Sequence, residues 1–267
     1  MSLSSRRPAI IDGGLLPTIF RPEEADLELK RLLGAFHDLA QHSETLFASP
    51  TDAFTVRTRI YHLPRFVFFG PNSGSGPIRL ALYAGWSGTD IRGMLALLGL
   101  IERLTLHPAV AAGYQLVFYP LVNPTGFQDR TVKTRSGAQL ETENWATSKA
   151  PEIDVLAKEF RLHSFHGWVS LHATAAHDRI QARVRGLPVD ADFFPIERGR
   201  FRIDWQTDAT TTEGPTAIVG DLPFGAFQLR LDVPTAWPDG LHTQAVGETV
   251  RAFLERYRRA FSHGIHL

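Results

Sequence analysis

The sequence predicts an α/β protein, a three-layer α/β/α domain built on a mixed, largely parallel twisted sheet. Apolar runs without strict alternation, such as residues 80–84 and 114–122, are typical of strands buried on both faces. An amphipathic helical segment at 90–104 follows the first of these strands, as expected for alternating strands and helices. Residues 179–185 alternate charged and apolar side chains, which indicates a strand with one solvated face and therefore a mixed sheet.

The helices are recognised by apolar residues that recur at intervals of three and four. Residues 23–41 begin with acidic side chains, which the helix dipole favours in a first turn, and residues 151–163 begin with a proline. In chain order we expect an extended segment (1–22), a helix (23–41), strands (54–63, 65–70 and 80–84), a helix (90–106), a strand (114–122), a long polar connection (123–145), a helix (151–163), strands (167–172 and 179–185), short pieces and turns (186–225), a strand (226–233) and a helix (242–261).

The composition excludes several classes of function. The chain of 267 residues has 28 basic and 28 acidic side chains, so no net charge attracts nucleic acid or an anionic membrane. The absence of cysteine excludes disulfides, thiolate catalysis and cysteine-based zinc sites. No apolar stretch is long enough for a signal peptide or a membrane span. We expect one domain over residues 1–267, located in the cytoplasm, with its oligomeric state open.

Polar side chains follow three of the predicted strands. Ser87 and Asp90 come after the strand at 80–84, His172 ends the strand at 167–172, and Asp232 lies near the end of the last strand. The carboxyl ends of parallel strands form the edge where α/β sheets keep their ligand sites. The sequence therefore predicts that these side chains meet at one site.

The order of the motifs resembles the zinc carboxypeptidase family and its deacylase relatives of the aspartoacylase and succinylglutamate desuccinylase types. "AGWSGTD" stands where that family has A-G-x-H-G-x-E, and "NPTG" matches its N-P-x-G. "GAQLETENW" resembles D-x-N-R-N-[FW], "SLHA" places a histidine at the third zinc ligand, and "LDVP" places an aspartate at the catalytic glutamate. The resemblance runs from the first helix to the end of the chain.

The resemblance implies hydrolysis of an amide bond in a peptide or an N-acyl amino acid by metal-activated water, with zinc as the cofactor. The transition-state arginine falls at Arg130, or at Val132 under stricter spacing. The implied residues are Ser87, Asp90 and His172 as metal ligands, Asp232 and Arg130 as catalytic residues, and Glu143, Asn144 and Trp145 as substrate-binding residues.

The departures from the family pattern fall on the metal ligands themselves. Ser87 replaces a histidine, and its hydroxyl is a poor ligand because its proton must leave, whereas catalytic zinc needs about three nitrogen or oxygen ligands. A harder ion such as Mn²⁺ would suit Asp90, Glu141 and Asp232. Either the protein is a metallohydrolase with altered ligands, or it is an inactive homologue that binds a peptide or a small acyl-amino acid.

Two further interpretations stay open. A serine hydrolase would use Ser87 on its strand–turn–helix, but Thr89 stands where the G-x-S-x-G elbow requires glycine. Alternatively, Ser87 caps a helix, His172 is a hydrogen-bonded core histidine, and Asp232 forms an ordinary ion pair with Arg230.

Overall fold

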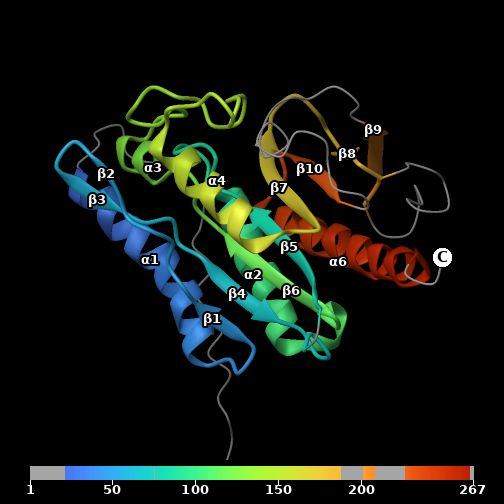
Figure 1. Cartoon of the computed structure of the whole chain (residues 1–267). Helices are drawn as coiled ribbons and strands as arrows, with labels where there is room; N and C mark the ends of the chain where they lie inside the picture. The colour runs from blue at the N-terminus through green and yellow to red at the C-terminus, as the bar shows by residue number, and fades with distance from the viewer. Residues whose placement is uncertain (1–21, 75, 188–200, 208–225, 265–267) are drawn as a thin grey trace, which may run out of the picture.

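The computed structural model describes residues 22–74, 76–187, 201–207 and 226–264 (Figure 1). Eight strands form one sheet in the order β1-β4-β6-β5-β7-β10-β8-β9. They are β1 (Leu46–Ala48), β4 (Phe66–Phe69), β5 (Ile78–Tyr83), β6 (Tyr114–Tyr119), β7 (Gly167–Thr174), β8 (Ile180–Arg185), β9 (Ile203–Thr207) and β10 (Phe227–Pro234). The expected extended segment at 1–22 lies, apart from its last residue, outside the described residues.

The centre of the sheet is parallel and its flanks are antiparallel. Strands β6, β5, β7 and β10 run in one direction. On one side β4 joins β6 antiparallel and β1 joins β4 antiparallel, and on the other side β8 joins β10 antiparallel. Strand β9 is parallel to β8. The predicted mixed, largely parallel sheet is confirmed, with its parallel carboxyl ends gathered at one edge.

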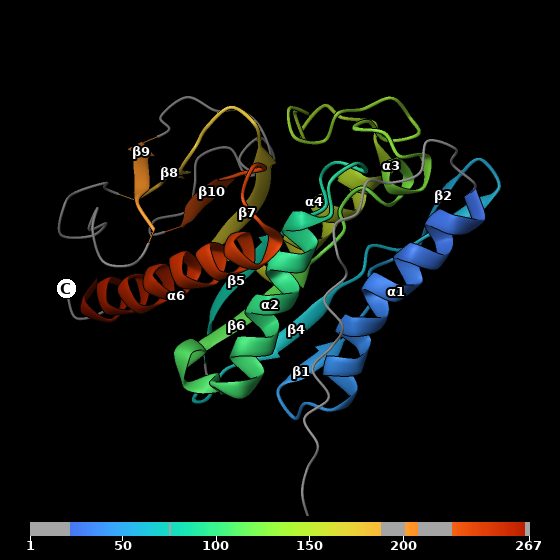
Figure 2. The same cartoon turned by 180° about the vertical axis from the view of Figure 1, so that it is seen from behind.

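Helices cover both faces of the sheet and make three layers, as predicted (Figures 1 and 2). Helices α1 (Pro22–Gln41), α2 (Arg92–Leu106) and α6 (Asp239–Gly264) lie on one face, and α4 (Pro151–His163) lies on the other. A short 3-10 helix, η1 (Pro108–Ala111), leads into β6. None of the helices in the described part of the chain combines the length and apolar character needed to cross a membrane.

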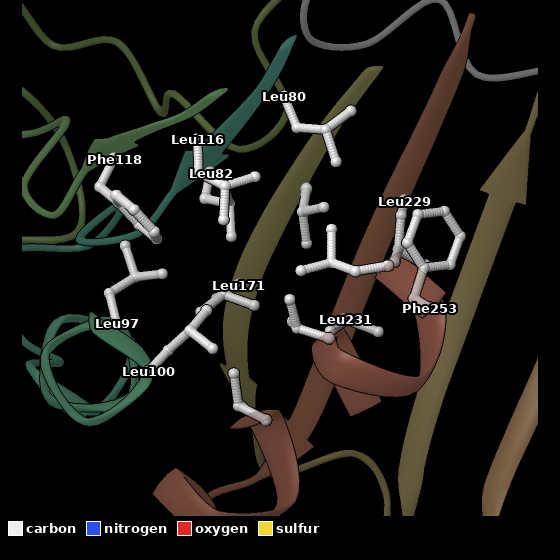
Figure 3. Close-up of a cluster of buried hydrophobic side chains, with 14 of the residues drawn as sticks. Leu80, Leu82, Leu97, Leu100, Leu116, Phe118, Leu171, Leu229, Leu231 and Phe253 are labelled. Atoms are coloured by element: carbon white, nitrogen blue, oxygen red, sulfur yellow. The ribbon is translucent and has the colours of Figure 1, made fainter. Parts of the chain in front are cut away.

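The larger core fills the space between the sheet and helices α2 and α6 (Figure 3). Its side chains include Leu80 and Leu82 of β5, Leu116 and Phe118 of β6, Leu171 of β7, Leu229 and Leu231 of β10, Leu97 and Leu100 of α2, and Phe253 of α6. The intervening residues of β5, Ala81 and Tyr83, belong to a second core with Phe160 of α4. Because both faces of β5 are covered, its sequence from Leu80 to Tyr83 is apolar without alternation.

Three local predictions are wrong. Residues 54–63 form a hairpin of β2 (Phe54–Val56) and β3 (Arg59–Tyr61), because Arg57 adopts a left-handed turn conformation with φ of 56°. The polar connection at 123–145 begins with a helix, α3 (Pro124–Asp129). Strand β1 was not expected. Each is a short element, and short elements carry too few residues to show a period.

Candidate functional site

A pocket of about 380 Å³ opens at the carboxyl edge of the sheet. Its walls come from the turn between β5 and α2, the end of β7 and the loop that follows α3. Ser87, Asp90 and His172, the three predicted metal ligands, all line it. The structure thus brings together three side chains that are up to 85 positions apart in sequence, as the strand-end argument predicts.

Close backbone packing fixes the turn that carries Ser87. A Cβ atom on Gly88 would lie only 2.0 Å from the carbonyl carbon and oxygen of Gly126, and a Cβ atom on Gly126 would lie 2.5 Å from Asn123 Nδ2, so neither glycine has room for a side chain. Asn123 is fully buried, accepts a hydrogen bond from the Gly126 N–H at 2.8 Å and donates one to the carbonyl oxygen of Trp86 at 3.0 Å. The "AGWSG" and "NPTG" motifs therefore form one interlocked unit.

The polar groups of the turn bond mainly to one another. Ser87 Oγ accepts from the Thr89 N–H at 3.2 Å and lies 2.8 Å from Thr89 Oγ1, so it does not cap α2. Asp90 Oδ1 accepts from the Arg92 N–H at 3.0 Å, and Arg92 Nη1 lies 3.7 Å away. Burial raises the pKa of Asp90 above its ordinary value, although Arg92 opposes that shift.

His172 is the deepest polar side chain of the pocket, with only 6% of its surface exposed. Its ring stacks on Trp86 with centroids 5.4 Å apart. Its Nδ1 has no hydrogen-bond partner among the described residues and lies 3.7 Å from Glu141 Oε1, too far for a hydrogen bond. Burial lowers the pKa of His172 in spite of Glu141, so the imidazole is neutral at neutral pH.

Glu141 also lines the pocket, although the sequence predicts it only as an alternative ligand, for a harder metal ion. It extends from the loop after α3, and its Oε2 lies 3.9 Å from Arg230 Nη2. Burial alone would raise the pKa of Glu141, but His172 and Arg230 outweigh it and hold that pKa below its usual value. Gln139, Arg92 and Thr235 also line the pocket, and no sequence pattern distinguishes them.

Asp232 lies beside His172 in the register of β10 and β7, but it is not among the described residues that line the pocket. Its side chain is 2% exposed, and Arg183 Nη2 donates to Oδ2 at 2.6 Å while Arg230 Nε donates to Oδ1 at 2.9 Å. Burial would raise the pKa of Asp232, yet Arg230, His172 and Arg183 together lower it. Asp232 therefore forms the expected ion pair with Arg230 and a second ion pair with Arg183.

Arg130, the predicted catalytic arginine, is not among the described residues that line the pocket. Arg130 takes a left-handed conformation at the end of α3 and forms an ion pair with Glu28 of α1, and Val132 lines the pocket instead. Arg130 and Val132 are the two positions at which the family resemblance places a transition-state arginine. Of these two, only Val132 lines the described pocket.

The three residues expected to bind substrate have local roles. Trp145 is buried, with its ring 6.3 Å from that of Tyr83 in the second core. Asn144 is exposed, and its Oδ1 accepts from the Ala146 N–H at 2.9 Å. Glu143, between Glu141 and Trp145, does not belong to the described pocket lining.

The described donor set does not fit a catalytic zinc ion. Within residues 22–74, 76–187, 201–207 and 226–264, no group of three or more histidine, aspartate or glutamate side chains is arranged to hold a metal. Asp90 and His172 are the strong donors of the predicted set, and Ser87 supplies only a hydroxyl already bonded to Thr89. Zinc in a catalytic site takes about three nitrogen or oxygen ligands from the protein.

Comparison with known proteins identifies the fold. No protein-family model matches the chain, and no curated protein matches it. Among solved structures, a metallo-carboxypeptidase from Burkholderia cenocepacia is 14% identical, with a TM-score of 0.66 over 88% of this chain and 69% of that one. A metallo-carboxypeptidase from Pseudomonas aeruginosa is 15% identical, with a TM-score of 0.60 over 88% and 68%. An aspartoacylase family protein from Mesorhizobium loti is 17% identical, with a TM-score of 0.51 over 76% and 66%.

The chain therefore has the metallo-carboxypeptidase fold, which confirms the resemblance seen in the motifs at the level of the fold. At identities of 14% to 17%, the likeness describes the fold and leaves the activity to be argued from the site.

Proposed function

We propose that this protein is a non-hydrolytic member of the metallo-carboxypeptidase fold whose pocket binds a peptide or a small acyl-amino acid. The proposal rests on the hydrogen bonding and position of Asp232, the residue that the family resemblance places at the catalytic base. Both of its carboxylate oxygens accept hydrogen bonds from arginines, and it stands outside the described pocket lining.

A general base must reach the proton that it removes and must bind that proton well. Asp232 is paired with Arg183 and Arg230 and is not among the described residues that line the pocket, and the lowered pKa makes its carboxylate a weaker base. The pocket itself keeps a volume and a mixture of polar and aromatic walls suited to a small ligand. Its chemistry therefore supports recognition better than hydrolysis.

Calorimetric titration with hippuryl-phenylalanine and N-acetyl amino acids tests the proposal. We expect saturable binding to the wild-type protein and none to a Ser87→Phe variant, because an aromatic ring on this half-buried turn would fill the pocket. The same ligands should not be hydrolysed when Zn²⁺, Mn²⁺ or Co²⁺ is added. Turnover that exceeds the rate with metal alone would overturn the proposal.

A metal-dependent hydrolase acting on amide bonds is the second candidate. It is favoured by the placement of Ser87, Asp90 and His172 around one pocket, in the order that the family resemblance implies. Asp90 and His172 would be the donors to such an ion, and the ion would supply activation of a bound water molecule. No reaction step is assigned to it, because the described donor set is incomplete.

Metal content separates the two candidates. For the binding protein we expect metal well below one equivalent by plasma mass spectrometry, in untagged protein purified without chelators and then soaked in Zn²⁺ or Mn²⁺. A stoichiometric ion that is lost in a His172→Ala variant would instead support the hydrolase. Loss in that variant alone, with retention in Glu44→Gln on the exposed turn before β1, would place the ion at the pocket.

A further inference from the structure

One wall of the pocket is a loop without regular structure of its own. Residues 130–150 connect α3 to α4 (Figure 1), and this described segment contains neither a helix nor a strand. It holds three of the residues that line the pocket, namely Val132, Gln139 and Glu141. A loop of this length has no ladder of main-chain hydrogen bonds, so other contacts must keep these three side chains in place.

Arg135, which lies between these lining residues, forms a forked ion pair with the helix that precedes the loop. Its Nε donates to Asp129 Oδ2 at 2.7 Å, and its Nη2 pairs with Asp129 Oδ1. Its other terminal nitrogen, Nη1, donates to the hydroxyl of Tyr61 on β3 at 2.7 Å. The Arg135 side chain is only 14% exposed. The planar guanidinium group thus ties the loop to α3 and to the β2–β3 hairpin at the same time.

The main chain of the same residue is attached to the interior. The Arg135 N–H donates to Thr125 Oγ1 at 3.1 Å, and Thr125 is a fully buried residue of α3. The Thr125 hydroxyl in turn donates to Glu152, a buried carboxyl group in the first turn of α4. The Thr134 N–H donates to the carbonyl oxygen of Ala138 at 2.8 Å and closes the turn around Arg135. One residue therefore links the loop to both flanking helices and to the hairpin.

The ion pair keeps both of its charges at neutral pH. The hydrogen bond from Arg135 lowers the pKa of Asp129 below its ordinary value, although partial burial opposes the shift. The charges of Arg57 and Arg59 on the hairpin act in the same direction as Arg135. An arginine stays protonated throughout the physiological range. The link between loop and helix is therefore intact under the conditions of a binding experiment.

We infer that Arg135 is a positioning residue of the pocket, which holds the loop wall in the arrangement that binds a ligand. Arg135 is not among the described residues that line the pocket, so it acts through its neighbours in the loop. The inference rests on the proposed function and names a residue on which the affinity of that site depends. Sequence spacing does not reveal this role, because Tyr61 lies 74 positions earlier.

The test uses Arg135→Met, which removes the guanidinium group and keeps an unbranched side chain. We expect its loop to form the pocket wall about a tenth of the time. The apparent Kd for hippuryl-phenylalanine, measured by calorimetry, should then rise about tenfold, because apparent affinity scales with the competent fraction. Hydrogen exchange followed by NMR should also accelerate about tenfold at the amides of positions 135 and 138, which donate to threonine hydroxyls in the wild-type protein.

Further variants separate positioning from a general loss of stability. Arg135→Lys keeps a charge opposite Asp129 and loses the fork, so its Kd should return to within about threefold of the wild-type value. Asp129→Asn should weaken binding about as much as Arg135→Met. The double variant should be no weaker than either single one, because both substitutions break the same contact. The control Arg251→Met breaks an exposed ion pair with Glu255 on α6 and should change neither affinity nor exchange.

The outcomes separate this inference from the proposed function. Ligand binding by the wild type with an unchanged Kd in Arg135→Met overturns the inference alone. Weaker binding without faster exchange at positions 135 and 138, or additive losses in the double variant, also overturns it. If Arg135→Met does not fold, Asp129→Asn and Arg135→Lys decide by the same two measurements. Failure of the wild type to bind hippuryl-phenylalanine or N-acetyl amino acids overturns the proposed function and the inference with it.

Discussion

Replacing Asp232 with alanine is expected to lower the free energy of unfolding by about 3 kcal/mol. The carboxylate is 2% exposed and is the shared acceptor of Arg183 and Arg230, whose own side chains are 35% and 24% exposed. Its removal leaves two guanidinium groups facing each other in a partly buried setting. Breaking such a pair costs more than the pair contributes, because the remaining charges lose their compensation.

Urea denaturation at neutral pH measures this effect. The matched control is Asp178→Ala, because Asp178 also pairs with an arginine but its side chain is 87% exposed. That exposed pair should contribute less than about 1 kcal/mol. A residue acting purely as a catalytic base would behave differently: its loss would abolish turnover and leave stability nearly unchanged. Equal stability of the Asp232→Ala variant and the wild type would contradict the structural role.

Acidification from pH 6.5 to pH 4 should destabilise the protein by about 3 kcal/mol through one histidine, His242. This side chain is 1% exposed, and neither ring nitrogen has a hydrogen-bond partner among the described residues. Burial, together with the nearby charge of Arg92, lowers the pKa of His242 from 6.5 to about 4.

The sign follows from proton binding. Between pH 6.5 and pH 4 the unfolded chain binds a proton at His242 and the folded protein does not, so acid favours unfolding over that interval. Other groups titrate in the same range, and a His242→Leu variant isolates this one. The variant should have a flatter stability profile between the two pH values, while His107→Leu, on an exposed histidine, should follow the wild type. Identical profiles for wild type and His242→Leu would exclude this histidine as the cause.

The long elements were predictable because the pattern of apolar residues in each sequence follows which of its faces are buried. Strand β5 is apolar from Leu80 to Tyr83 because both faces are covered there, and α4 shows its period and its first-turn proline. The hairpin of β2 and β3 was missed because Arg57 makes its turn, where glycine or asparagine is the usual signal. Helix α3 was missed because Asn123 and Pro124 read equally well as a turn and as a helix start.

The site was predictable only in its position. Ser87 follows β5 and His172 lies near the end of β7, and topology alone brings the carboxyl ends of such parallel strands together. The partners of the charged residues depend on neighbours that chain order does not specify. Asp232 meets Arg183 through the antiparallel β8, and Arg130 meets Glu28 from a helix 102 residues earlier. These ion pairs determine whether Asp232 and Arg130 are available to contact a ligand in the pocket.

The close contact between Gly88 and Gly126 fixes the main chain around the pocket and does not involve the side chains that line the pocket. The path of the main chain depends on two positions where a side chain is excluded, whereas the polar side chains that line the pocket stand at the neighbouring positions 87 and 90. Substitution of the side chains at positions 87 and 90 therefore leaves this main-chain contact unchanged. Such a scaffold can exchange the side chains at positions 87 and 90 one at a time without a change in the path of its main chain.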